Sequence, residues 1–278
     1  MTLTDLTKEY VAVHVSKLKS ADILRRSIEK YVAQLGDGAL DAITKARVAL
    51  WHRGIGEKYP QAANAALKQL SAMFEYALTE GYITRNPCKG VTMFSSTPRK
   101  RFLKEHELAK LNEVLETVDP FARVFVKMLL FTACRRDEAR TVEWAHLDLA
   151  AKRWTKPSTK TTPHTTVLPD ALVAELEMLP RRGRYVFGTR HGNPWQRSKV
   201  QEIWEVVRAK AGLDDVHIHD LRRTTATLLD QRGVSLSTIQ KVLNHSNITT
   251  TQRYLVGLSV NDAVVDALNH HANTVRMK

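Results

Sequence analysis

Cysteine is scarce in this chain of 278 residues, which contains only Cys88 and Cys134. Two cysteines are too few for a disulfide framework, and they lack the paired spacing of a zinc site. His270 and His271 have no carboxylate or cysteine partner at ligand spacing, so we interpret them as part of a solvated tail. We therefore expect a reducing compartment and no bound metal.

Long apolar runs are missing as well. The longest, residues 121–134, is interrupted by Arg123 and Lys127, whereas a membrane span needs about 20 apolar residues in succession. The first ten residues include three charged side chains and no apolar segment of the kind that a secretory signal requires. We therefore expect a cytoplasmic protein without a membrane segment.

Acidic residues are in the minority: 29 Asp and Glu stand against 42 Lys and Arg, and the formal net charge is +13. A surplus of cations this large favours a polyanionic partner, most often a nucleic acid. Hydrophobic residues make up 43% of the chain, so it can bury a core, and its length is that of one large domain or two modest ones.

The first part of the chain has the pattern of a helical bundle. Apolar residues recur three to four positions apart, most regularly over residues 61–78, and Gly81 follows as a natural C-cap. The pair Asn86-Pro87 then stops the pattern. We expect a helical domain over residues 1–91.

A basic linker follows this domain. Residues 92–101 combine Ser, Thr and Pro without periodicity and end in three cations, Arg99, Lys100 and Arg101. The rest of the chain, residues 102–278, is then a second domain.

The second domain mixes helices with a small hairpin. Residues 154–169 are rich in Thr and Val, with a turn near Pro163, which is typical of two short strands. The predicted fold class is therefore mainly α with a small antiparallel β-sheet. Helical patterns occupy residues 105–118, 121–133, 197–211, 219–233, 237–243 and 261–272.

Four short segments carry side chains that suit chemistry on a phosphate ester. Taken singly, each has an ordinary structural explanation: arginines after a buried helix cap its carbonyls, a lysine at a hairpin tip is solvated, and a tyrosine packs half-buried. An HxxR sequence at a helix start is also weak evidence by itself, although helix starts suit anions. Taken together, the candidates are Arg135, Lys160, His219, Arg222, His245 and Tyr254.

These residue types together suit the cleavage of a phosphodiester without metal. The planar fork of arginine matches two phosphoryl oxygens and stabilises the charge that develops on them. Tyrosine becomes a nucleophile when nearby cations help to remove its proton. Lysine can protonate a leaving oxygen, and histidine accepts or donates a proton near neutral pH.

The motifs resemble those of the tyrosine recombinase, or phage integrase, family. Residues 132–138, TACRRDE, are similar to the family's first arginine box, and residues 219–227, HDLRRTTAT, to its second. The family's next box appears as LNH at 243–245, nine residues before Tyr254. Residues 67–91 are similar to the end of the family's helical core-binding domain, so the resemblance covers nearly the whole chain.

The resemblance implies a role for each matching residue. Tyr254 is the nucleophile, and Glu138 supports the first arginine. Lys160 precedes the VLP sequence at 167–169 as the family's hairpin lysine does, and Lys156 is the less favoured choice. The implied catalytic set is Arg135, Lys160, His219, Arg222, His245 and Tyr254, and the implied DNA contacts are Arg99, Lys100, Arg101 and Arg223.

Three positions depart from the family's pattern. Ala133 and Asn244 stand where the family generally has glycine, and Asp137 replaces a small residue. None of the three supplies a catalytic group. Asparagine tolerates the left-handed conformation that a glycine there would adopt.

The resemblance implies a two-domain recombinase. Its core-binding (SAM-like) domain binds DNA, and its mixed α/β catalytic domain cleaves one strand through a 3′-phosphotyrosine, exchanging duplexes through a Holliday junction without metal, ATP or other cofactor. The implied partners are double-stranded DNA with specific recombination sites, other protomers in a tetramer on DNA, and accessory DNA-bending proteins, all at the nucleoid. The helix at 261–272 would dock on a neighbouring subunit or pack on its own domain. The core-binding pattern begins near Met1, so we expect either a simple recombinase without a separate arm-binding domain or a chain that has been shortened.

Two alternatives remain open. A type IB topoisomerase uses a similar set of residues but rejoins the same strand. A DNA-binding regulator without catalysis is the other, because residues 231–245 resemble a helix-turn-helix with Gly233 in the turn. The regulator explains the charge and leaves Arg135, Lys160 and Tyr254 unexplained.

Overall fold

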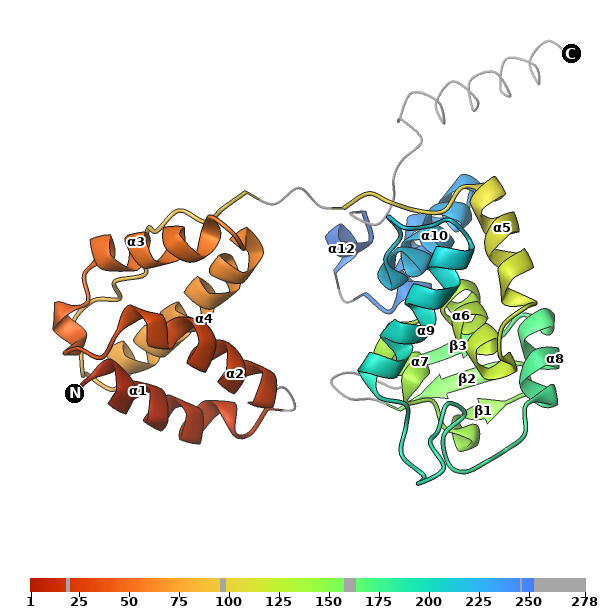
Figure 1. The fold of residues 1–278 in the computed structure, drawn as a ribbon, viewed down its shortest axis with the longest axis horizontal. Helices are drawn as coiled ribbons and strands as arrows, with labels where there is room; N and C mark the ends of the chain where they lie inside the picture. The colour runs from red at the N-terminus through yellow and green to blue at the C-terminus, as the bar shows by residue number, and fades with distance from the viewer. Residues whose placement is uncertain (19–20, 96–98, 158–163, 246, 253–278) are drawn as a thin grey trace, which may run out of the picture. The chain divides into compact units, whose positions relative to one another are not determined.

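The computed structural model describes residues 1–252 except 19–20, 96–98, 158–163 and 246. The chain forms two compact units, residues 1–97 and 98–278, each with its own hydrophobic core (Figure 1). The expectation of a mainly helical fold with a small antiparallel sheet is confirmed. The boundary between the units falls within the sequence predicted as a linker, and the role of each unit stays a prediction.

The N-terminal unit packs around one long helix. Pro60 occupies the first turn of α4, and small and apolar side chains line its buried face at helical spacing, from Ala63 to Ala77. Gly81 lies just past its end with a positive φ of 74°, as the sequence predicted. The helices are α1 (Leu3–Tyr10), α2 (Ala21–Tyr31), α3 (Lys45–Gly56) and α4 (Pro60–Thr79), with a π-helix at Val11–Val15 and 3₁₀ turns at Val32–Leu35 and Leu40–Ala42.

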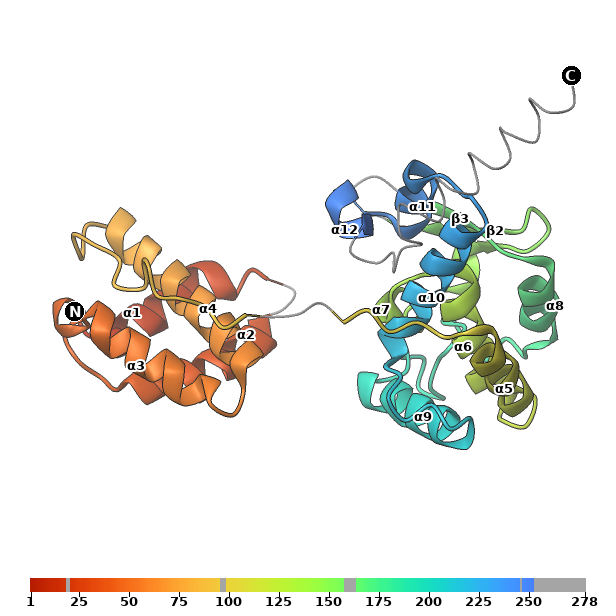
Figure 2. The same cartoon turned by 90° about the horizontal axis from the view of Figure 1, so that it is seen from above.

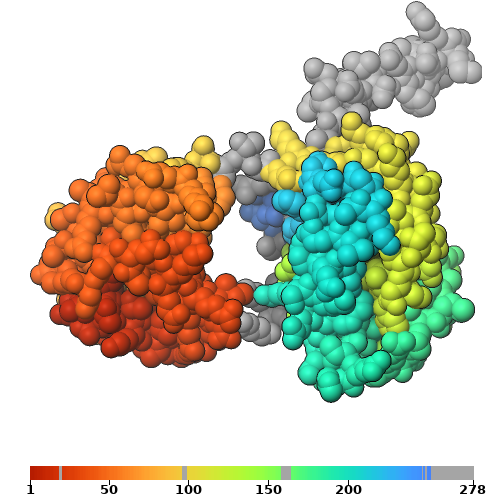
Figure 3. Space-filling view, viewed as in Figure 1, coloured from red at the N-terminus to blue at the C-terminus, as the bar shows by residue number. Residues whose placement is uncertain are grey.

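The C-terminal unit surrounds an apolar helix, α6 (Pro120–Thr132), which packs against α7, α8 and α10. Lys127 is buried on α6, where Glu116 and Glu175 accept its hydrogen bonds. Figure 2 shows α6 and α10 crossing this unit, and Figure 3 shows α5 beside α9 on one of its faces. The remaining helices are α5 (Glu105–Leu115), α7 (Arg136–Arg140), α8 (Asp170–Met178), α9 (Arg197–Lys210), α10 (Ile218–Gln231), α11 (Leu236–Leu243) and α12 (Ile248–Gln252).

A three-stranded antiparallel sheet in the order β1-β2-β3 lies in the same unit. It consists of β1 (Leu147–Asp148), β2 (Arg153–Lys156) and β3 (His164–Val167). Lys156 lies opposite His164 in the register, so both residues stand at the turn end of the β2–β3 hairpin. The predicted hairpin is confirmed, whereas β1 and α8 were not anticipated.

Helices α10 and α11 are joined by a tight turn in which Gly233 has a φ of 76°. The order helix, turn, helix agrees with the pattern noted for residues 231–245, and its use as a DNA-binding motif stays a prediction. The described residues include no helix with both the length and the apolar character that crossing a membrane requires.

Candidate active site

The first arginine box lies where α6 ends. The C-cap of α6 is Ala133, fully buried and left-handed with a φ of 50°, and this turn directs the next residues away from the helix axis. Arg135 then becomes the N-cap of α7. Ala133 thus takes the conformation that glycine adopts more easily, at the position where the family generally has glycine.

Glu138 fixes Arg135 in place at the start of α7. One of its oxygens accepts the Arg135 backbone N–H at 3.1 Å, and the other accepts the guanidinium Nη1 at 2.9 Å. Arg135 Nη2 donates to the carbonyl of Asn244 at 3.3 Å. The Arg135 side chain is still 44% exposed, so its guanidinium is oriented by the protein yet accessible to a ligand.

Lys156 shares the same carboxylate. Its Nζ lies 3.1 Å from Glu138 Oε2 and 4.4 Å from the centre of the Trp154 ring, and its side chain is only 10% exposed. Burial alone would raise the pKa of Glu138, but the Lys156 charge and the hydrogen bonds from Arg135 outweigh it and lower the pKa to about 2. Glu138 is therefore ionised at neutral pH and orients two cations.

Arg222 lies in the first turns of α10 and is 2% exposed. Its guanidinium donates to the carbonyls of Ala133 and Leu243, which lie at the C-terminal ends of α6 and α11. Helix ends leave such carbonyls without intrahelical partners. The arginine of the second box therefore joins the two helix ends from which Arg135 and His245 follow.

His245 follows Asn244, the left-handed C-cap of α11 with a φ of 48°. Its Nε2 lies 2.9 Å from Arg222 Nη2, and its Nδ1 lies 3.0 Å from Thr251 Oγ1. Arginine only donates, so Nε2 must accept and the proton sits on Nδ1. Burial, followed by the charges of Arg222 and Arg135, lowers the pKa of His245 to about 4, which keeps the ring neutral at pH 7.

Two further histidines lie in the same field of cations. His219 lies in the first turn of α10, on the same side as Arg222. Desolvation by the surrounding protein, followed by the charges of Arg222 and Arg135, lowers the pKa of His219. Burial, then Lys156, lower the pKa of His164 on β3. The His164 Nε2 atom is buried with no hydrogen-bond partner among the described residues.

The structure thus brings four of the six predicted catalytic residues into one centre: Arg135, His219, Arg222 and His245. Lys160 and Tyr254 lie outside the described residues. Lys156, the less favoured lysine, is the one seen beside Glu138. Within the described ranges, no group of three or more metal-ligating side chains occurs.

Sequence reasoning gave no role to His164, Thr251 or Asp220. The alternation of side chains along the hairpin could have placed His164 beside Lys156. Asp220 stands three residues after His217, and its carboxylate caps α10 by accepting the His217 N–H at 2.9 Å.

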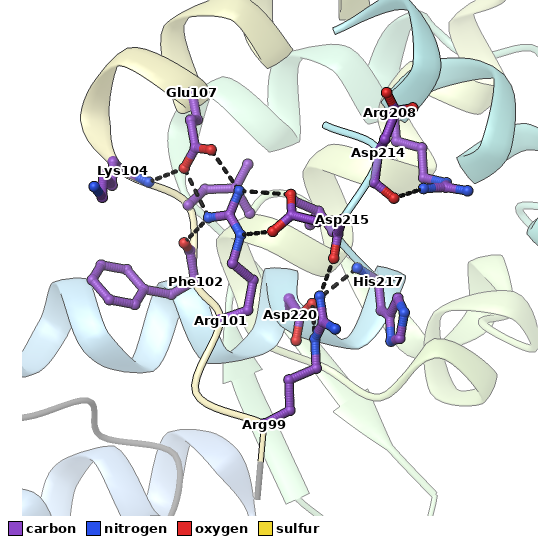
Figure 4. Close-up of polar contacts among 12 residues, drawn as sticks. Arg99, Arg101, Phe102, Lys104, Glu107, Arg208, Asp214, Asp215, His217 and Asp220 are labelled. Carbon is purple, nitrogen blue, oxygen red and sulfur yellow. Dashed lines mark hydrogen bonds and ion pairs between the residues drawn. The ribbon is translucent and has the colours of Figure 1, made fainter. Parts of the chain in front are cut away.

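The predicted DNA contacts have different surroundings from one another. Arg99 and Arg101 form ion pairs with acids of their own unit, Asp220 for the first and Glu107 and Asp215 for the second (Figure 4). Lys100 is exposed. Arg223 is half-buried on α10. The sequence predicted that all three linker cations contact DNA, whereas in the structure two of them pair with acids.

Comparison with known proteins gives one family. The model of the phage integrase family matches residues 101–257. A tyrosine recombinase XerC-like protein of Caldanaerobacter subterraneus subsp. tengcongensis is 27% identical over 248 residues, covering 73% of this chain and 63% of the relative. The integrase of Mycobacterium phage FRAT1 is 23% identical over 288 residues, covering 94% of this chain and 86% of the relative.

Solved structures show the same fold. A lambda integrase dimer bound to a COC′ core site superposes with a TM-score of 0.78 at 20% identity, covering 94% of this chain and 97% of the other. The Tn1549 transposon integrase in complex with transposon right-end DNA gives a TM-score of 0.81 at 16% identity, covering 97% and 99%.

Proposed function

Because the chain belongs to the phage integrase family, we propose that it is a site-specific DNA recombinase that cleaves and rejoins strands through a 3′-phosphotyrosine. The observation that carries this proposal is the meeting of Arg135, Arg222 and His245 at one centre. These residues come from the loop after α6, the start of α10 and the loop after α11. Neither a helix cap nor a DNA-binding helix needs that convergence.

The two arginines have different tasks in this mechanism. Arg222, already bonded to two carbonyls, is rigid and supplies a fixed positive charge. Arg135 is oriented by Glu138 and remains accessible, so its fork can meet two non-bridging oxygens of the scissile phosphate. Together they stabilise the charge that grows on those oxygens as the phosphorus is attacked.

Proton transfers complete the step. Tyr254 attacks phosphorus through its phenolic oxygen, loses its proton, and forms a phosphotyrosine while the bond to the 5′ oxygen breaks. Neutral His219 has a lone pair that can receive that proton, whereas the lone pair on Nε2 of His245 already accepts a hydrogen bond from Arg222. Lys160 protonates the leaving 5′ oxygen, and Lys156 beside Glu138 is the alternative donor.

Strand transfer reverses the reaction with a new partner. The 5′-hydroxyl of a second duplex attacks the phosphotyrosine, so the bond energy is retained and no ATP is consumed. Two such rounds through a Holliday junction exchange the duplexes. We propose a tetramer on double-stranded DNA carrying specific sites, with accessory bending proteins, acting in the cytoplasm at the nucleoid. A lambda integrase tetramer bound to a Holliday junction, similar in fold, supports this assembly.

The test uses the full-length protein and Tyr254→Phe. Duplexes that bind the wild-type protein are first selected from a labelled pool with a randomised core. The selected duplexes are nicked within the core, incubated with each protein in EDTA, and run on denaturing gels. We expect a protein–DNA adduct with the wild type and none with Tyr254→Phe, which should bind normally because only a hydroxyl is lost. Tight binding without an adduct would instead favour the regulator.

A further inference from the structure

Two arginines at the end of the linker segment contact the helix that carries His219 and Arg222. Arg99 Nε lies 3.0 Å from Asp220 Oδ2 in the first turn of α10, and its guanidinium also donates to the carbonyl of Asp215 (Figure 4). All of these groups belong to the unit of residues 98–278.

Arg101 anchors the same segment a little further along. It donates to both oxygens of Asp215, at 2.7 and 3.2 Å, and to both oxygens of Glu107, so its fork is engaged on two sides (Figure 4). Hydrogen bonds from Arg101 lower the pKa of Glu107 and of Asp215. The guanidinium of Arg101 is therefore committed to the protein, which leaves it poorly placed to serve as the DNA contact that the sequence suggested.

Asp220 is the point at which the segment meets the site. It is 4% exposed, and the same oxygen that pairs with Arg99 also accepts the backbone N–H of His217. A buried carboxylate is costly unless a cation compensates it. Arg99 supplies that charge, and so supports the cap that begins α10.

A second contact lies one turn further along α10. The Leu103 N–H donates to Thr224 Oγ1 at 2.9 Å, and Thr224 donates back to the Asp220 carbonyl. Residues 220 and 224 share one face of the helix, whereas residue 222 points to the opposite face. The segment 99–103 therefore supports the face of α10 opposite Arg222.

We propose that Arg99 is a positioning residue for strand cleavage, acting through Asp220 to set the first turn of α10 and so the places of His219 and Arg222. This rests on the proposed function. Arg101 anchors the segment, and Lys100 is the cation of the three that we assign to DNA. Lys100 pairs with none of the described residues, which makes it the matched control at the adjacent position.

The experiment measures full-length variants on the duplex recovered with the wild type. It compares Arg99→Gln, Arg99→Lys, Asp220→Asn, the double variant Arg99→Gln/Asp220→Asn, and Lys100→Gln. Asparagine keeps one oxygen for the His217 N–H, removes the charge and replaces the other oxygen with an NH2 group. The readouts are the dissociation constant, its salt dependence, and the rate of adduct formation at saturating DNA.

We expect Arg99→Gln to slow adduct formation at saturating DNA by about tenfold to a hundredfold, with the dissociation constant and salt slope unchanged, because a small misplacement of reacting groups is costly. Asp220→Asn should match it, the double variant should be no slower than either single, and Arg99→Lys should recover part of the rate. Lys100→Gln should weaken binding, reduce the salt slope by about 1 and keep the saturated rate.

Several results would overturn the proposal. One is an Arg99→Gln variant that binds weakly with a reduced salt slope and a normal saturated rate, which is the behaviour of a phosphate contact. Another is a double variant whose loss equals the product of the single losses. Hydrogen exchange of the amides in the first turn of α10 tests the structural step without DNA: it should quicken in Arg99→Gln, and unchanged exchange would contradict positioning even if the wild type forms no adduct.

Discussion

Arg222 performs a structural task with the same guanidinium that, in the proposed mechanism, supplies a fixed positive charge. It satisfies carbonyls at the ends of two helices and donates to His245, all in a buried setting. Buried polar groups without partners are expensive, so this residue stabilises the fold whether or not DNA is present.

We therefore expect Arg222→Gln to lower the free energy of unfolding by about 3 kcal/mol, because Ala133, Leu243 and His245 would lose their donor. Urea denaturation followed by circular dichroism measures this. Arg136→Gln is the control, because Arg136 is half-buried and its ion pair is a long one, to Asp137 at 4.0 Å. It should change the free energy of unfolding by less than about 0.5 kcal/mol. A stable Arg222→Gln protein would show that the carbonyls find other donors.

Arg135 should behave differently, because it is accessible and held mainly by Glu138. We expect Arg135→Lys to slow adduct formation by about 10² to 10³-fold while binding and stability stay near wild type, since a point charge replaces a fork. Single-turnover kinetics at saturating DNA measure the rate. A rate of adduct formation within a few-fold of wild type would show that Arg135 has no catalytic role.

At the scale of residues, the sequence predicts charge and spacing but not partners. The HxxR motif placed His219 and Arg222 on one side of a helix, yet nothing in it indicates that Arg222 reaches Ala133 and Leu243. Those contacts depend on where α6 and α11 end in space. The roles of the catalytic residues stay predictions until the variants are measured.

At the scale of elements, α6 and α11 both end in a left-handed residue that is not glycine, Ala133 and Asn244. Each is followed within two residues by a site side chain, Arg135 or His245. The left-handed turn at each cap therefore leads the chain from the end of a helix directly to a side chain of the site.

The cap of α11 gives a test. Asn244→Val should cost about 1 to 2 kcal/mol, because a branched side chain disfavours a φ of 48°, and it should also slow cleavage by moving His245. Asn244→Gly, the matched control, should retain near wild-type stability and activity because glycine adopts this conformation freely. Thermal denaturation measures the stability of both variants, and adduct assays measure their cleavage rates. Equal stability and equal rates in the two variants would show that the conformation of residue 244 does not position His245.

Periodicity predicted the longer helices well. The observed α4, α9, α10 and α11 begin and end within two residues of the predicted segments, because each buries one regular apolar stripe. Helix α7 has five residues and begins where the Glu138 carboxylate accepts the Arg135 N–H, and β1 has two residues and exists through pairing with β2. Elements that short carry no period of their own, so the pattern cannot reveal them.

At the scale of the whole molecule, the number of basic residues overstates how many cations are available to a polyanion. Arg99 and Arg101 are among the 42 Lys and Arg, yet both pair with acids of their own unit. Composition predicted a polyanionic partner and could not distinguish cations that face a ligand from cations that hold the chain. The ion pairs in the structure show which cations hold the chain.

Acid should destabilise the folded protein through its histidines. The pKa of His245 is about 4 when folded against about 6.5 when unfolded, so between these values the unfolded chain binds more protons. The contribution of His245 to stability is therefore full above about pH 6.5 and is lost as the pH falls towards 4. The lowered pKa values of His219 and His164 act in the same direction.

We expect the urea midpoint to fall between pH 7 and pH 5, and to fall less steeply in His245→Gln. His106→Gln, an exposed position on α5, is the control and should keep the wild-type slope. If His245→Gln kept that slope too, the neutral, Arg222-bonded state of His245 would be contradicted.

The bonds of Arg222 to the ends of α6 and α11 also bear on inheritance. Cells degrade poorly folded proteins, so substitutions at Arg222 should reduce abundance and be masked by a second, intact copy. Under the proposed function, Tyr254→Phe should still bind the same DNA without cleaving it, and so should interfere with its intact counterpart. Substitutions at Arg222 would thus be recessive, whereas loss of the Tyr254 hydroxyl would be dominant.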